Sequence, residues 1–419
     1  MSKTNAHSRL SPSNSEQCDV VVLGGGPAGA AAAITLARAG RLVAVLEKSL
    51  YDQPRIGETL SPAARSPLAR LGVWDQFLGS GHAASPSIVS VWGGDAVVEN
   101  HFIFNPYGNG WHLDRTAFDV MLATAARRAG ARLFCGVDVT SCEPAMADPP
   151  LSGWRIEFAH RHQIHQLHAT SVIDATGRVA AMARRQGAHR IAADHLVGLV
   201  VILRTDAPTD QHEAATVVEA GEEGWWYSAP LPGARFIVAY MTDADLLPRQ
   251  RRSWTEFWHA RLQTTVQTQE QLRSCGASFI HSPDVRVIAA NSSRLDRTCG
   301  PGWVAVGDAA LAFDPLSGKG LLRALTSAIS AGEAIDRSQG GDGAALTQYD
   351  HSAQQTFRDY ERMRAIFYRR ERRWPDSTFW RRRHRATAPE TSRPSPPFVA
   401  FQQERERPIH WPEDSHELN

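Results

Sequence analysis

The chain has 419 residues, of which 42% are hydrophobic and 21% are charged, and its formal net charge is +1. This composition is typical of a soluble globular protein, and the length predicts two lobes with an appendage. A net charge this close to zero excludes a global attraction to nucleic acid or to anionic membranes.

The first 17 residues are polar and contain no apolar segment, so we expect a disordered tail and no secretory signal. The longest apolar stretch, residues 20–46, is interrupted by glycines and arginines and is therefore not a membrane span. Five widely spaced cysteines predict neither a disulfide framework nor a metal site. A cytoplasmic location is consistent with these features.

The first motif joins a strand to a helix. Residues 18–23 are apolar and β-branched, which predicts a buried parallel strand, and the alanine-rich residues 30–39 predict a helix. Between them, residues 24–29 satisfy G-x-G-x-x-G. A second apolar run, residues 42–46, ends at Glu47. This order of strand, glycines, helix, strand and acid is typical of a dinucleotide-binding site.

Each position of this motif has a physical role. Gly24 allows a tight turn, Gly26 lets the backbone approach a pyrophosphate, and Gly29 lets helix and strand pack closely. The helix N-terminus offers N–H groups to the phosphates. Glu47 lies 18 residues after Gly29 (47 − 29), near the spacing expected for an acid that binds ribose. A glycine-rich turn without a ligand is the alternative, and the motif does not distinguish FAD from NAD.

Two later segments repeat the strand-to-turn pattern. Residues 172–178 and 302–310 are apolar runs that end in acidic, glycine-containing turns. In the second turn, Asp308 is placed to accept a hydrogen bond from a polyol, or it is a helix cap. The turn at residues 318–320 opens a helix predicted over residues 321–335, which makes its N–H groups an anion site.

Together these motifs resemble those of the single-component flavin monooxygenases, whose relatives include the flavin-dependent halogenases and the geranylgeranyl-reductase-like oxidoreductases. The resemblance covers roughly residues 18–385 and implies bound FAD, with molecular oxygen as co-substrate. The reductant (NADH, NADPH or reduced flavin) is not distinguished. The cofactor-binding residues that the resemblance implies are Gly24, Gly26, Pro27, Ala28, Gly29, Glu47, Lys48, Arg115, Asp174, Gly177, Asp308, Pro315, Gly318, Lys319 and Gly320.

The resemblance implies oxidation through a flavin C4a-hydroperoxide, which delivers an electrophilic oxygen to an electron-rich ring. Halogenases divert that oxidant to halide, need a reactive lysine beyond the glycine motif, and carry a Trp-x-Trp-x-Ile-Pro signature. This chain has Gly-Trp-Trp-Tyr-Ser-Ala-Pro at residues 224–230 and no lysine in residues 57–92. Hydroxylation is therefore favoured over halogenation.

The same segments are similar to a narrower group, the monooxygenases that oxygenate a tryptophan of a partner polypeptide during tryptophylquinone cofactor biogenesis, as for the γ subunit of quinohemoprotein amine dehydrogenase. We therefore expect hydroxylation of a partner's tryptophan. The alternatives are hydroxylation of a small aromatic metabolite, reduction of an isoprenoid double bond, and a non-catalytic flavin-binding chaperone.

Five residues are candidates for substrate binding and catalysis. Trp225, Trp226 and Tyr227 form an aromatic wall for the substrate, or they belong to the core. Lys319 stabilises an anionic reduced flavin as a catalytic residue, or it is solvated. Glu58 is a catalytic residue that faces the flavin ring, or it is an acid at a helix start. No metal site is expected.

The C-terminal region is basic. Residues 361–385 carry ten arginines against three acids, with two tryptophans between them. We interpret this segment as a docking surface for an acidic partner polypeptide, with packing over the substrate lobe or a solvated helix face as alternatives. Nucleic acid ranks last because the chain has no nucleic-acid-binding motif. Residues 386–419 are expected to be poorly ordered.

The predicted fold is α/β: a Rossmann-like FAD-binding domain with an inserted mixed β-sheet substrate domain and a C-terminal helical tail, like that of p-hydroxybenzoate hydroxylase. The predicted division of the chain, after a tail at residues 1–17, is an FAD-binding domain at 18–80, 106–190 and 285–350, a substrate domain at 81–105 and 191–284, and a C-terminal region at 351–419.

Overall fold

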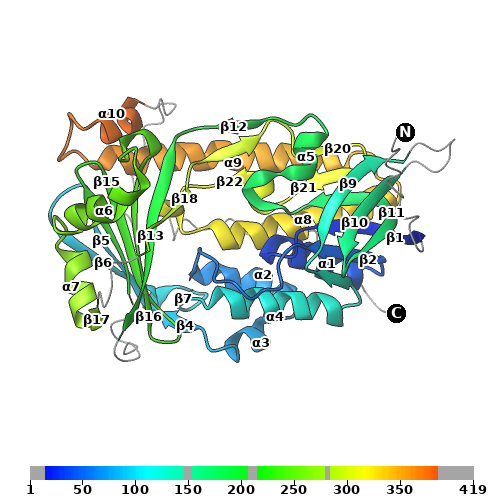
Figure 1. The fold of residues 1–419 in the computed structure, drawn as a ribbon, viewed down its shortest axis with the longest axis horizontal. Helices are drawn as coiled ribbons and strands as arrows, with labels where there is room; N and C mark the ends of the chain where they lie inside the picture. Colours follow the sequence, from blue (N-terminus) through cyan, green and yellow to red (C-terminus); the bar gives the residue numbers. More distant parts are fainter. Residues whose placement is uncertain (1–14, 146–152, 206–214, 279–283, 386–419) are drawn as a thin grey trace, which may run out of the picture.

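The computed structural model describes residues 15–145, 153–205, 215–278 and 284–385. Two sheets stand beside each other, one in an α/β part and one in a mainly antiparallel part, and a long C-terminal helix runs from the first to the second (Figure 1). The predicted α/β fold with an inserted sheet is confirmed.

The first sheet contains five parallel strands in the order β8, β2, β1, β11, β21. The first strand of the chain lies in the middle, as in dinucleotide-binding folds. Strand β1 begins at residue 15, inside the tail predicted for residues 1–17, and residues 1–14 lie outside the described residues. The strands of this sheet are β1 (Ser15–Leu23), β2 (Val43–Glu47), β8 (Arg132–Cys135), β9 (Asp138–Pro144), β10 (Trp154–His160), β11 (Gln163–Asp174), β20 (Cys299–Gly300) and β21 (Trp303–Ala305).

Helices cover one face of this sheet, and small side chains bring them close together. The alanine run of α1 is buried between the sheet and α8, where a Cβ added at Gly332 would lie 3.1 Å from Thr35. On the other face, side chains of the parallel strands pack with those of β9 and β10, the antiparallel strands that extend from β11, and with part of α9. The helices of this part are α1 (Pro27–Arg38), α2 (Arg65–Arg70), α3 (Trp74–Leu78), α4 (Arg115–Arg128), α5 (Ala181–Arg185) and α8 (Gly320–Gln339).

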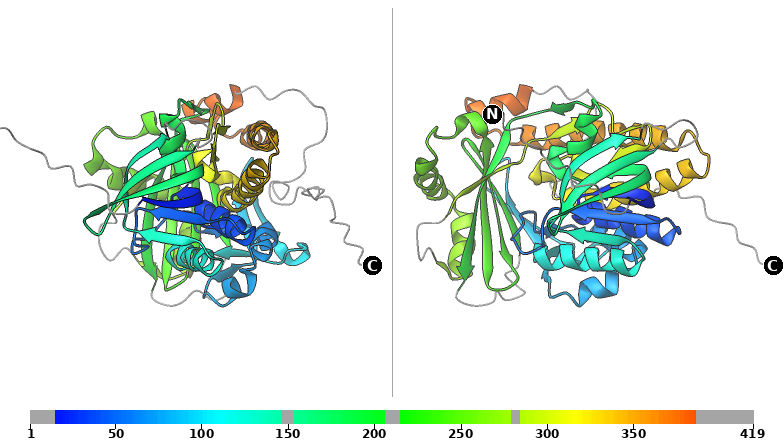
Figure 2. Two further views of the ribbon diagram at one scale, coloured as in Figure 1. Left: turned by 90° about the vertical axis from the view of Figure 1, so that its right-hand side faces the viewer. Right: turned by 45° about the vertical axis from the view of Figure 1, so that its right-hand side comes forward.

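The second sheet has the order β17, β13, β16, β15, β14, β5, β6, with β18 also paired to β13. Helices α6 (Trp254–Leu262) and α7 (Gln267–Ser274) cover the face that points away from the first part (Figure 2). Residues 286–289 pair with β13 and so belong to this sheet, not to the FAD-binding domain predicted from residue 285. Its strands are β5 (Ser87–Val91), β6 (Val97–His101), β13 (Leu196–Thr205), β14 (Thr216–Gly221), β15 (Gly224–Leu231), β16 (Arg235–Asp243), β17 (Ala277–Ser278) and β18 (Arg286–Ala289).

Helix α9 (Ala345–Arg370) ends beside the second sheet, where α10 (Thr378–Arg385) follows (Figure 1). No helix within the described ranges is long and apolar enough to cross a membrane. The predicted tail, residues 386–419, lies outside the described residues. Two small sheets complete the part of the chain that is described: β12 (Arg190–Ala192), β19 (Ser293–Leu295) and β22 (Leu311–Ala312), and β3 (Thr59–Leu60), β7 (Gly110–His112) and β4 (Ala83–Ser85).

Candidate functional site

A cavity of about 720 Å³ lies where β1, β2, β11 and β21 reach their carboxyl ends. In open α/β sheets, ligands bind at this edge. Ten of the residues predicted to bind the cofactor line the cavity: Gly24, Gly26, Pro27, Ala28, Glu47, Lys48, Arg115, Gly177, Asp308 and Gly320.

The glycines form a cradle that side chains would fill. Gly24 has φ +101°, and a Cβ there would lie 2.4 Å from the carbonyl oxygen of Ala175. Gly29 does not line the cavity, but a Cβ on it would lie 1.8 Å from the carbonyl oxygen of Gly24, which accords with its predicted packing role. Within the described residues no side chain caps α1 at Gly26, so the N–H groups of its first turn remain for a ligand.

Glu47 closes one side of the cradle. Its side chain is nearly buried and accepts hydrogen bonds from the N–H of Gly25 at 2.6 Å, the N–H of Ser49 at 2.9 Å and the guanidinium of Arg55 at 2.9 Å. Burial raises the pKa of Glu47, but the hydrogen bonds from Ser49 and Gly25 outweigh it and hold the pKa below its usual value. Glu47 is therefore an ionised acceptor, which suits the hydroxyls of a ribose.

Two arginines lie in the wall of the cavity, and sequence reasoning found only one of them. Arg115 donates to the carbonyls of Ile56 at 2.7 Å and Gly57 at 3.0 Å. Arg55 was missed, although it belongs to the segment that follows β2. Both arginines contact the buried carboxylate of Asp119, at 3.1 Å for Arg55 and 3.2 Å for Arg115. Fixed guanidinium groups at a helix N-terminus suit the charge of a diphosphate, so the cavity fits FAD.

The prediction of a cofactor contact for Asp174 is wrong. Its carboxylate is fully buried and does not line the cavity. It accepts hydrogen bonds from the N–H groups of Thr176, Met182 and Ala183 at 2.8–3.0 Å. The acid at the end of β11 therefore holds the turn into α5. Asp308 does line the cavity, and its carboxylate lies 3.6 Å from the guanidinium of Arg178.

The turn before α8 lies beside the cavity, and only its end reaches it. Pro315 and Gly318 belong to a 3₁₀ turn that leads into Gly320, and they do not line the cavity. Lys319 lines a separate cavity of about 160 Å³ with Arg323 and residues of α9. The role of Lys319 at the flavin edge therefore stays a prediction, since the cavity that it lines is not the one formed by the glycines.

Glu58 lies between the cofactor cavity and the second sheet. It is 4% exposed, and its Oε1 has no hydrogen-bond partner among the described residues. The next residue, Thr59, shares a hydrogen bond of 2.6 Å with the hydroxyl of Tyr227 on β15. Burial raises the pKa of Glu58 to about 7, against the opposing effect of Arg115 and, more weakly, Arg235. Glu58 is thus a buried acid that can hold or release a proton near neutral pH.

The aromatic segment on β15 does not form one wall. Trp226 faces α6 and α7, where its ring lies 5.5 Å from that of Trp258. Trp225 faces the first part, fully buried, and its indole N–H donates to the hydroxyl of Tyr368 at 3.0 Å. Because strand neighbours point to opposite faces, the two tryptophans do not form one wall: Trp225 and Tyr227 share the face toward the first part, and Trp226 lies on the other face.

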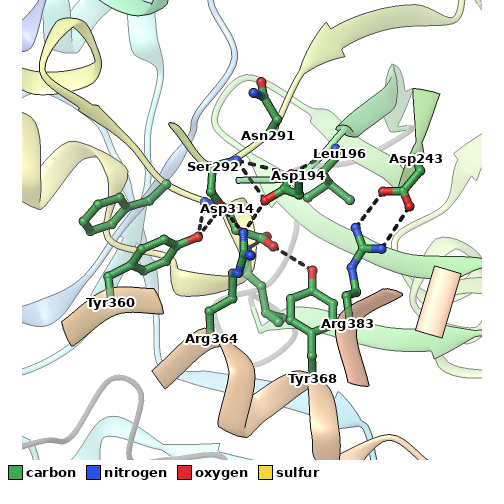
Figure 3. Close-up of polar contacts among 12 residues, drawn as sticks. Asp194, Leu196, Asp243, Asn291, Ser292, Asp314, Tyr360, Arg364, Tyr368 and Arg383 are labelled. Carbon is green, nitrogen blue, oxygen red and sulfur yellow. Dashed lines mark hydrogen bonds and ion pairs between the residues drawn. The ribbon is translucent and has the colours of Figure 1, made fainter. Parts of the chain in front are cut away.

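Half of the ten arginines of the basic C-terminal region form ion pairs with acids of the same chain. Arg383 is buried and pairs with Asp243 at 2.8 Å, and Arg364 pairs with Asp194 (Figure 3). Arg373 pairs with Glu371 at 2.7 Å. Further along, Trp380 is fully buried and Arg382 also contacts Asp243. These contacts fasten α9 and α10 to the second sheet, whereas Arg372, Arg381 and Arg385 are exposed, so docking of an acidic partner on this region stays a prediction.

The cradle, the ribose acid and the cationic wall define a dinucleotide-binding flavoprotein fold. The FAD dependent oxidoreductase family matches residues 19–275. Over 379 residues the chain is 32% identical to LodB of Marinomonas mediterranea, assigned as an FAD-dependent oxidoreductase, and the match covers 89% of this chain and 98% of LodB. The chain belongs to the FAD-dependent oxidoreductase family.

Two solved structures have the same fold over most of the chain. The flavin-dependent halogenase CmlS is 25% identical with a TM-score of 0.76, covering 88% of this chain and 68% of its own. The peptidyl tryptophan dihydroxylase QhpG, essential for tryptophylquinone cofactor biogenesis, is 27% identical with a TM-score of 0.71, covering 88% and 78%. The protein is thus an FAD-dependent oxidoreductase whose relatives include halogenases and a hydroxylase.

Proposed function

We propose that the protein is an FAD-dependent monooxygenase that hydroxylates an electron-rich aromatic ring, with a tryptophan side chain of a partner polypeptide as its substrate. The observation that carries the proposal is the set of residues between the cofactor cavity and the second sheet. A buried carboxylic acid, Glu58, and the hydroxyl of Tyr227 lie there, and the segment 57–92 contains no lysine.

The positions of the lysines argue against halogenation, the reaction of the relative CmlS. The whole chain has three lysines: Lys3 lies outside the described residues, Lys48 lines the cofactor cavity, and Lys319 lines a separate cavity beside α9. By the resemblance, a halogenase needs a reactive lysine in the segment that follows the second strand, and residues 57–92 of this chain contain none. The likeness to QhpG over 88% of the chain supports a peptide tryptophan as substrate.

The chain's own residues have distinct tasks in this proposal. Bound FAD supplies the activation of oxygen, with electrons from a reductant of the nicotinamide or flavin class. Glu47 and the two arginines of the wall hold the nucleotide, and the second sheet excludes water from the ring. Glu58 accepts or returns a proton during oxygenation, because its pKa of about 7 places both protonation states within reach.

The test is intact mass spectrometry of an acidic, tryptophan-containing polypeptide encoded in the same operon. It is incubated with FAD-loaded protein, a reductant, isotopically labelled oxygen, catalase and chloride. A gain of one or two labelled oxygen atoms on one tryptophan supports the proposal, and the FAD-deficient variant Gly29→Val is the control. A gain of chlorine establishes a halogenase, and oxygenation of free indoles or phenols alone establishes a small-molecule hydroxylase.

A further inference from the structure

The turn that leads into α8 is anchored from α9. Asp314, the residue before this turn, is 2% exposed. Its backbone N–H donates to the hydroxyl of Tyr360 at 2.8 Å. Its carboxylate accepts from the hydroxyl of Tyr368 at 2.7 Å and from the N–H of Leu316 at 2.9 Å. Two tyrosines of one helix therefore fix the start of the turn, and the turn ends at Gly320 in the cofactor cavity.

These tyrosines belong to a stripe on α9. Tyr360, Arg364 and Tyr368 are four residues apart, which places them on one face of a helix. Figure 3 shows the three side chains pointing from α9 toward Asp194 and Asp314. Arg364 binds Asp194 and the hydroxyl of Ser292, and Tyr360 shares a hydrogen bond of 2.6 Å with the same hydroxyl. The stripe is held at its centre by an ion pair.

The hydroxyl of Tyr368 also connects the two sheets. It accepts the indole N–H of Trp225, on β15, and donates its own proton to Asp314. The guanidinium of Arg383 lies 5.0 Å from the centre of the same ring and pairs with Asp243 on β16. A single hydroxyl therefore links the second sheet to the turn beside the cofactor cavity, and α10 fixes that ring in place.

We infer that Tyr368, with Tyr360, is a positioning residue that sets the turn at residues 314–320 against the cofactor cavity and the second sheet. The helices α9 and α10 would then influence the flavin site through the turn at residues 314–320, without contacting the cofactor. The inference rests on the proposed function only in taking the isoalloxazine to lie beside this turn. A purely structural role, in which the network only stabilises the fold, is the competing explanation.

The test compares Tyr368→Phe with Tyr349→Phe in the FAD-loaded protein. Tyr349 is a matched control because it lies on the same helix, is 8% exposed, and donates its hydroxyl to the carbonyl of Ala305 at 2.8 Å. Each variant deletes one buried hydroxyl, and urea unfolding of both separates the loss of stability from the effect on the flavin. The readouts are the absorption spectrum and reduction potential of bound FAD and, during turnover, the share of electrons released as hydrogen peroxide.

We expect Tyr368→Phe to shift the flavin spectrum and potential and to raise peroxide release roughly tenfold, whereas Tyr349→Phe leaves all three near the wild type. Trp225→Phe removes the donor to Tyr368 and should shift the spectrum and potential in the same direction by less, which keeps the test valid if Tyr368→Phe folds poorly. An equal effect of the two tyrosine variants, or no effect on the flavin, overturns the inference. Because spectrum and potential need no substrate, a failure of the proposed hydroxylation is separable from this outcome.

Discussion

Replacing Glu58 by glutamine should remove a pH-dependent loss of stability. The pKa of Glu58 is about 7 in the folded protein, against an ordinary value of 4.5. A carboxyl whose pKa is higher in the folded state stabilises that state below pH 4.5, and the contribution is lost as the pH rises through 7. For this shift the loss between about pH 5 and about pH 8 is about 2.5 kcal/mol.

The assay is urea unfolding of the wild type and Glu58→Gln at these two pH values. The stability of the variant relative to the wild type should rise by about 2.5 kcal/mol from the lower to the higher pH, while oxygenation at neutral pH falls because an amide exchanges no proton. The matched control is Glu219→Gln: Glu219 is equally buried but accepts from the N–H groups of Val266 and Thr268, so this change should destabilise the protein. If the free energies of unfolding of the wild type and Glu58→Gln differ by the same amount at both pH values, the reasoning is refuted.

Three further predictions concern the cradle, the C-terminal helices and Lys319. Gly29→Val should lower FAD affinity at least about a hundredfold, since even a Cβ would lie 1.8 Å from a carbonyl oxygen; flavin content after purification measures this, and a fully loaded variant contradicts it. Arg383→Met should cost about 1.5–3 kcal/mol in urea unfolding because it removes the buried hydrogen bonds to Asp243, which keeps only its contact with Arg382, whereas exposed Arg381→Met should change little. Lys319→Ala should leave FAD affinity within about twofold by fluorescence titration, and a large loss would place the lysine at the cofactor after all.

The nucleotide cradle was predictable because its chemistry is local. A strand, a glycine turn and a helix N-terminus make a phosphate site from one continuous segment. The spacing of the glycines predicts which positions cannot carry a side chain. The structure places Gly24, Gly26 and Glu47 where the spacing puts them, at one edge of the sheet. Arg55 escaped prediction because its role depends on Asp119, which a separate helix brings to it.

The residues beyond the cradle were harder to predict because their surroundings come from distant parts of the chain. Trp225 and Trp226 are adjacent in sequence, yet β15 sends them to opposite faces of the sheet. That alternation was available from the strand pattern, but which face meets the cofactor was not. Asp174 and Asp308 show the same limit: each follows a buried strand, and only the position of α5 decides that the first caps a turn while the second faces the cavity.

The arginines of the C-terminal region show the same limit most clearly, because their acidic partners are distant in the sequence. Composition presents them as a surface for an acidic partner, because sequence shows their charge without the charges that meet them. Asp194 and Asp243 precede them by more than a hundred residues, yet the fold brings each acid to an arginine of α9 or α10. A buried arginine must be paired to be tolerated, so these contacts account for the buried arginines of the region, Arg364 and Arg383, without any partner. The exposed arginines Arg372, Arg381 and Arg385 stay available to a docked polypeptide, whose tryptophan the proposed reaction requires to reach the junction at Glu58 and Tyr227.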